Sequence, residues 1–75
     1  MIIISQDKKM LANFENIVSI TIVSFENDHS VYAISGDLEN LILGTYPTEK
    51  RAMDVLDKIV NARGLGMYAY QMPKK

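Results

Sequence analysis

The sequence contains no cysteine, and only one of its 75 residues is a histidine. Without cysteine there is no disulfide, no thiolate nucleophile and no cysteine-based zinc or iron–sulfur site. No uninterrupted apolar run exceeds four residues, far short of the ~20 residues that a membrane-spanning helix needs. An excess of either charge is also lacking, because eight Lys and Arg stand against nine Asp and Glu. This balance gives no electrostatic reason to expect a nucleic-acid or anionic-membrane partner.

The composition is that of a folded chain, with 48% hydrophobic and 23% charged residues. These values exclude a disordered tail and predict a single domain over residues 1–75. The apolar start Met1–Ile4 is too short for a secretory signal, so a cytoplasmic location is expected. Because so small a domain has no disulfide, it needs either a well-packed core or a second subunit to cover apolar surface.

Short strands are predicted where β-branched and aromatic residues gather between polar breaks. The expected strands are Ile2–Ile4, Met10–Phe14, Ile17–Phe25, Val31–Ser35, Leu41–Tyr46 and Met67–Met72. Turns are expected at Gln6–Lys9, at Glu26–Ser30 and at Gly36–Asn40. The first five strands are expected to form a meander, in which each later strand pairs with the one just before it.

The segment Ile17–Phe25 shows the clearest strand pattern. Alternation places Val18, Ile20 and Ile22 on one face. The opposite face is apolar at its ends, where Ile17, Val23 and Phe25 lie, and carries hydroxyl groups in the middle. Because a sheet with one solvated face alternates more cleanly, part of this second face is expected to be covered by sheet curling or by a partner.

A helix is predicted after Tyr46, because Pro47 ends the strand and Thr48 suits the N-cap. The expected apolar stripe comprises Ala52, Val55, Leu56, Ile59 and Val60. Gly64 is expected to be the left-handed residue that ends the helix. The fold class is therefore α+β: an antiparallel β-meander of about five strands, one amphipathic helix on one face, and a final strand, in the order β-β-β-β-β-α-β.

Candidate groups for catalysis or metal binding are few. His29 lies in an expected turn without a second nitrogen ligand nearby, so a solvated turn residue is the favoured interpretation. The glycines of Gly64–Gly66 follow a helix, whereas phosphate-binding glycines precede one. Asp54 and Asp57 lie on the polar side of the helix, where solvated carboxylates catalyse little. The sequence therefore predicts no enzyme, no metal ion and no cofactor.

Two tyrosines, Tyr68 and Tyr70, share one face of the last expected strand, and Lys74 and Lys75 follow them. Aromatic side chains flanked by positive charge can stack unpaired bases. A small nucleic-acid-binding regulator that uses this strand is therefore the alternative function, although the neutral overall charge disfavours it. Tyrosines on a small sheet more often complete a core or an interface.

The opening Met1–Lys8, the block that includes Tyr46 and Thr48, and the ending Tyr70–Pro73 resemble small uncharacterised proteins of low-GC Gram-positive bacteria (Firmicutes) and their phages or mobile elements. The chain departs from them in its short link between helix and last strand. The resemblance implies an origin and a fold, and it implies no functional site.

The leading hypothesis is a non-enzymatic interaction module that self-associates, for example as a homodimer, or docks on another protein. The candidate interaction residues are Val23, Phe25, Tyr68 and Tyr70. A partner could also add a strand to an exposed sheet edge.

Overall fold

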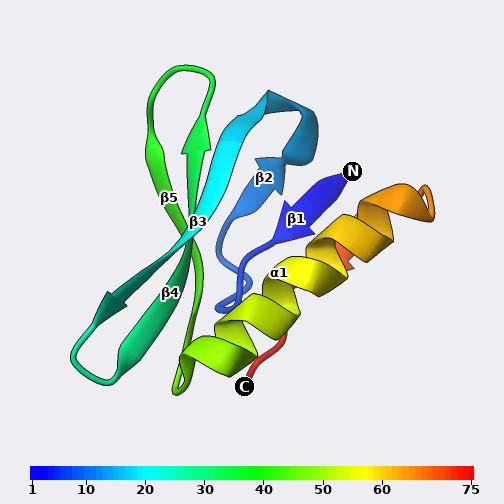
Figure 1. Cartoon of the computed structure of the whole chain (residues 1–75). Coiled ribbons are helices and arrows are strands. Elements are labelled where there is room, and N and C mark those ends of the chain that lie inside the picture. The colour runs from blue at the N-terminus through cyan, green and yellow to red at the C-terminus, as the bar shows by residue number, and fades with distance from the viewer.

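Six strands form two three-stranded sheets, and one long helix packs against them in the computed structural model, which describes residues 1–75 (Figure 1). The elements are β1 (Ile2–Ile4), β2 (Leu11–Asn13), the 3-10 helix η1 (Phe14–Asn16), β3 (Ile17–Phe25), β4 (Asp28–Ser35), β5 (Asn40–Tyr46), α1 (Glu49–Gly64) and β6 (Ala69–Gln71). The α+β class and the order of the elements are confirmed.

The pairing of the strands differs from a continuous meander. One sheet has the order β2-β1-β6, in which β1 is antiparallel to β2 and parallel to β6. The other is the antiparallel sheet β3-β4-β5. The break falls between β2 and β3, where η1 redirects the chain and the Asn13 side chain accepts a hydrogen bond from the Glu15 N–H at 3.2 Å. The last strand returns to the first, not to the fifth.

A β-bulge near the start of β3 changes which residues face the core. The register with β4 shifts between Ile17 and Ser19, so one residue of β3 is left over. Ile17 consequently packs against the core together with Ile20 and Ile22, whereas Val18 is 71% exposed. The expectation that Val18 shares a face with Ile20 and Ile22 was wrong, because a bulge interrupts the strict alternation from which it was derived.

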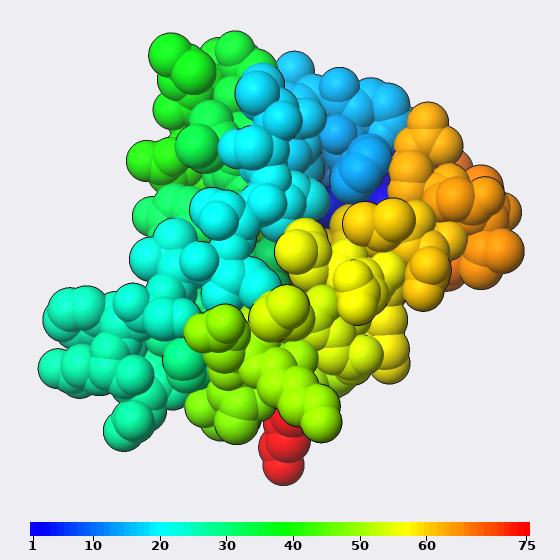
Figure 2. All heavy atoms as spheres, in the orientation of Figure 1, coloured from blue at the N-terminus to red at the C-terminus, as the bar shows by residue number.

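The hairpin between β3 and β4 is tighter than expected. Phe25 lies opposite Asp28, so only Glu26 and Asn27 form the turn, and Glu26 has a φ of 55°. His29 and Ser30, which were assigned to the turn, are part of β4. Figure 2 shows the residues around this hairpin as a lobe that projects beyond the start of the helix.

Two of the other turns repeat one hydrogen-bond pattern. Ser5 and Ser35 are both buried, and each hydroxyl donates to the aspartate two residues later, Asp7 at 2.7 Å and Asp37 at 2.6 Å. This hydrogen bond is the main cause that lowers the pKa of each aspartate. A Ser-x-Asp sequence therefore closes both the β1–β2 and the β4–β5 connection.

The helix begins as expected, because the Thr48 hydroxyl accepts a hydrogen bond from the Arg51 N–H at 3.1 Å. The buried residues of α1 are Ala52, Val55, Ile59 and Ala62. Leu56 is only half-buried, and Val60 is 61% exposed, so the prediction that Val60 belongs to the buried stripe was wrong. The buried side of α1 is narrower than the predicted apolar stripe, and it includes Ala62 in place of Val60. α1 is neither long nor apolar enough to cross a membrane, and the chain has no other helix that is.

The residue that ends α1 in the left-handed conformation is Gly66, with a φ of 72°, and not Gly64, which is still helical. The Gly66 N–H donates to the Arg63 carbonyl and the Met67 N–H donates to the Ala62 carbonyl, both at 3.1 Å. These are the two bonds of a Schellman motif. The motif delays the last strand, which spans Ala69–Gln71 instead of starting at Met67.

The core lies between α1 and the two sheets. Its buried hydrophobic members are Ile3, Ala12, Val31, Ala33, Leu43, Tyr46, Ala52, Val55, Ile59 and Met72. Because α1 contacts β3, β4 and β5 from one side only, the other face of that sheet is left without a cover. We call this uncovered side the outer face.

Candidate interaction surface

The outer face of the β3-β4-β5 sheet consists of rows of side chains that lie opposite one another on neighbouring strands. The register places Thr21 opposite Tyr32, and Tyr32 opposite Ile42 on the next strand. The residues of this face are Ser19, Thr21, Val23, Phe25, Asp28, Ser30, Tyr32, Ile34, Asn40, Ile42 and Thr45. Asp28 is the single charged residue among them. The outer face is therefore a mixed apolar and hydroxylated surface that is almost free of charge.

The most exposed apolar groups of the outer face lie on its two edge strands. Phe25 and Val23 on β3 are 73% and 46% exposed, and Ile42 on β5 is 52% exposed. Tyr32 and Ile34, on the central strand, are half-buried by their neighbours. In the row of Val23, the Ser30 and Thr45 hydroxyls lie 3.0 Å apart and share one hydrogen bond. An apolar partner would thus cover mainly the side chains at the edges of the face.

The strand β3 pairs with β4 alone, so its other side is a free edge. In a two-residue hairpin the residues that flank the turn form a hydrogen-bonded pair, and such pairs alternate along the ladder. Counting back from Phe25, this alternation directs the backbone N–H and C=O groups of Ile20, Ile22 and Ser24 away from β4. These groups are available to another strand.

The four candidate interaction residues do not form one cluster. Val23 and Phe25 lie on the outer face of β3, whereas Tyr68 and Tyr70 belong to the region of β6, in the other sheet. Tyr70 packs against the core, and burial raises the pKa of its phenol. Tyr68 precedes the strand and is 85% exposed. Of the two tyrosines that base stacking would use, only Tyr68 is largely exposed.

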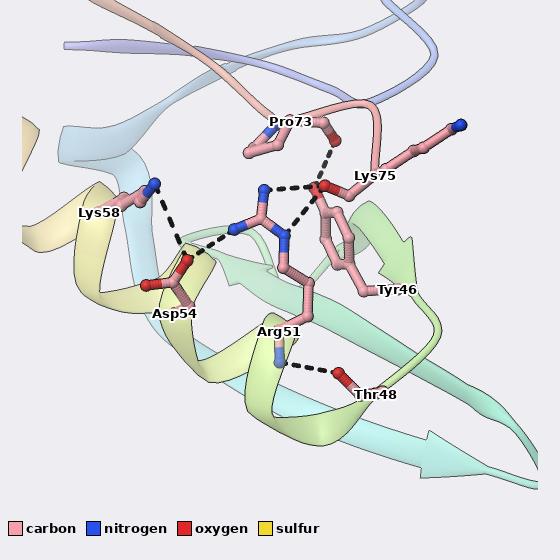
Figure 3. A network of polar contacts seen from close by, with 7 residues as sticks. All are labelled: Tyr46, Thr48, Arg51, Asp54, Lys58, Pro73 and Lys75. Carbon is pink, nitrogen blue, oxygen red and sulfur yellow. Dashed lines mark hydrogen bonds and ion pairs between the residues drawn. The ribbon is translucent and has the colours of Figure 1, made fainter.

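The chain after β6 is held against the start of α1 by a polar network (Figure 3). Arg51 donates through Nε and Nη2 to the Lys75 oxygen at 2.9 and 2.8 Å, and through Nη1 to Asp54 at 2.6 Å. The Tyr46 hydroxyl donates to the Pro73 carbonyl at 2.8 Å, and the Arg51 guanidinium lies 5.8 Å from the centre of the Tyr46 ring. With these partners, Arg51 and Tyr46 serve to fix the tail.

Because the Tyr46 phenol is buried, the free energy of unfolding is expected to change with pH in the alkaline range. Burial, the largest cause, raises the pKa of Tyr46 from 10.0 to about 12. The folded chain therefore holds this proton more tightly than the unfolded chain, so the contribution is complete below pH 10 and is lost as the pH rises towards 12. We expect the urea midpoint to fall between about pH 10 and pH 12, and to fall less in Tyr46→Phe, which lacks the titrating hydroxyl.

Tyr68→Phe is the matched control for this prediction, because it removes a phenol that is already exposed in the folded chain. Its midpoint should follow the wild-type pH dependence, because the buried Tyr46 phenol is still present. Equal pH dependence in Tyr46→Phe and the wild type would contradict the assignment.

The groups with catalytic potential lie apart from any enclosed site. The Ser24 hydroxyl is 2.7 Å from His29 Nδ1, in an exposed cross-strand pair. No three His, Cys, Asp or Glu side chains are placed to hold a metal ion together. The largest hollow, of about 460 Å³, is bordered by Gln6 and Gln71. Gln6 is already bonded to Thr45 and Lys74, so its amide is not free to recognise a ligand.

Comparisons with protein families, with curated proteins and with solved structures give no match. The expected kinship with small proteins of Gram-positive bacteria and their phages therefore stays a prediction. Any functional proposal for this chain depends on its own geometry, and the outer face and free edge of β3 are its most distinctive surface.

Proposed function

We propose that the chain is a non-enzymatic interaction module that self-associates through the β3-β4-β5 sheet. The observation that supports this proposal is the uncovered outer face, where Val23, Phe25 and Ile42 are exposed and Asp28 is the only charge. Sheets normally bury one apolar face and solvate the other with polar side chains. Apolar side chains on the second face are typical of a surface that another protein covers.

A second copy of the chain is the partner that fits this surface best. In a two-fold interface each surface meets its own copy, so a charged patch would repel itself and a neutral patch would not. The nine residues of β3 contain no charged side chain. Only 14 of the 75 residues are buried, and small domains without disulfides commonly gain stability by oligomerisation.

Sedimentation equilibrium over a range of concentrations tests the proposal. We expect a reversible monomer–dimer equilibrium, with dimer dominant at concentrations of about 1 mM, which corresponds to even a weak association of about −4 kcal/mol. A single monomeric species across the whole range would overturn self-association. Circular dichroism at each concentration shows whether the chain stays folded.

A further inference from the structure

We infer that two copies pair along β3 in antiparallel orientation, with Ile22 opposite Ile22 of the second copy. The β3-β4-β5 sheets of the two copies then form one continuous six-stranded sheet. This inference depends on the proposed self-association and names its geometry. The starting point is the free edge, where Ile20, Ile22 and Ser24 direct unpaired backbone groups outward. Such an edge can pair with the same edge of a second copy, because a two-fold axis relates the two identical strands of an antiparallel pair.

The edge lacks the features that usually prevent such pairing. Exposed edge strands are protected by charged residues, especially lysine, by proline, or by being very short. The sequence of β3 is nine residues long and contains neither a charged residue nor a proline. Its bulge lies at the first residues, so the segment from Ser19 to Phe25 pairs regularly with β4 and is a straight template.

The register follows from the three outward residues. When Ile22 lies opposite its copy, Ile20 lies opposite Ser24 of the second copy, and Ser24 opposite Ile20. Every outward residue then has an outward partner, and each of these pairs can exchange two backbone hydrogen bonds. A shift of two residues towards the N-terminus would bring Val18 of the bulge into the ladder, and a shift the other way would use the turn.

The same register covers the apolar side chains that lie along this edge. On the outer face, Val23 would lie opposite Thr21 of the second copy, and Phe25 opposite Ser19. The helix contributes on the inner face, where α1 packs beside β3 (Figure 2). Met53 and Val60, which are 52% and 61% exposed, share one side of α1.

That side of the helix is away from Arg51, whose contacts hold the tail after β6. In the paired sheet both helices lie on the same face, and the two-fold axis relates their free sides across the β3–β3 junction.

Disulfide formation between introduced cysteines tests the register, because the native chain has no cysteine to interfere. Chains carrying Thr21→Cys are mixed with chains carrying Val23→Cys and mildly oxidised. These positions would be directly opposite in a non-hydrogen-bonded pair, with Cα atoms about 4.5 Å apart, within the range of about 4.4–6.8 Å that a disulfide spans. We expect a mixed covalent dimer to dominate the products.

Two controls use the same chemistry. Val23→Cys alone places its two thiols on diagonal neighbours about 7–8 Å apart, where bridging is poor. Ile42→Cys lies on the same outer face with similar exposure, but on the opposite edge strand β5, so mixing it with Val23→Cys should give no specific dimer. Circular dichroism of each variant verifies the fold before oxidation.

Amide hydrogen exchange gives a second, substitution-free measurement. As the concentration rises, the amides of Ile20, Ile22 and Ser24 should become protected, whereas Thr21 and Val23 are already protected by β4. A wild-type dimer without this alternating protection, or with cross-linking through Ile42→Cys, would overturn edge pairing and leave self-association standing. A strictly monomeric wild type would instead overturn the proposed function itself.

Discussion

Replacing Ile59 with alanine is expected to lower the free energy of unfolding by about 2–5 kcal/mol. Ile59 is 0% exposed and belongs to the core between α1 and the sheets. The loss comprises the transfer of the deleted methyl groups and the cavity that remains. A domain of this size has a total stability of about 4–11 kcal/mol, at about 0.05–0.15 kcal/mol per residue. The substitution should therefore remove a large part of the stability, and urea unfolding measures it.

The neighbouring substitution Val60→Ala is the control, because the same helix carries it and its side chain is 61% exposed. Its effect should stay within about 0.5 kcal/mol when it is measured at concentrations where the chain is monomeric. Similar losses at both positions would show that α1 is rotated relative to the sheet, and would contradict the buried stripe described above.

The comparison of Ile59 with Val60 also shows how far the sequence predicts the helix. Helical periodicity and the Thr48 cap predicted the position of α1, and the structure confirms both. Periodicity defines an apolar side of a helix but not how much of that side the neighbouring sheet covers. In the structure, α1 buries Ala62 and leaves Val60 exposed to solvent.

Strand positions were predictable to within a few residues, and three of the four expected neighbour pairings, β1–β2, β3–β4 and β4–β5, are confirmed. The break between β2 and β3 and the partner of β6 were not predictable. Alternation is a local signal, and the parallel pairing of β1 with β6 joins the two ends of the sequence. No glycine or proline in the sequence marks the bulge that exposes Val18 to solvent. Both features depend on how distant segments pack, which no local pattern records.

The same limit of local sequence patterns applies to the four candidate interaction residues. Val23 and Phe25 were proposed because their strand is apolar on both faces, and the structure places both on the outer face. Tyr32 and Ile42 of the same face were missed as candidates, because alternation alone does not tell which face of a strand the helix covers. Tyr70 packs against the core, which is one of the two placements expected for a tyrosine on a small sheet.

Gly44→Ala is expected to destabilise the chain by about 2–4 kcal/mol. A Cβ atom at Gly44 would lie 2.8 Å from the Tyr46 hydroxyl and 3.1 Å from two ring carbons. The Tyr46 ring is 1% exposed, and its hydroxyl is bonded to Pro73, so it has little room to move aside. Overpacking of this kind costs about 1–3 kcal/mol, and the loss of the hydroxyl's hydrogen bond adds about 1 kcal/mol.

The same substitution at Gly64 should have the opposite sign. A Cβ atom there meets nothing within 4 Å, and Gly64 lies in the last turn of α1 without a positive φ. Alanine is favoured over glycine in helices by up to about 1 kcal/mol, so Gly64→Ala should raise the urea midpoint.

In a Tyr46→Phe background the penalty of Gly44→Ala should shrink, because the closest atom is gone while the ring carbons remain. An equal penalty in both backgrounds would show that the hydroxyl contact is not its cause.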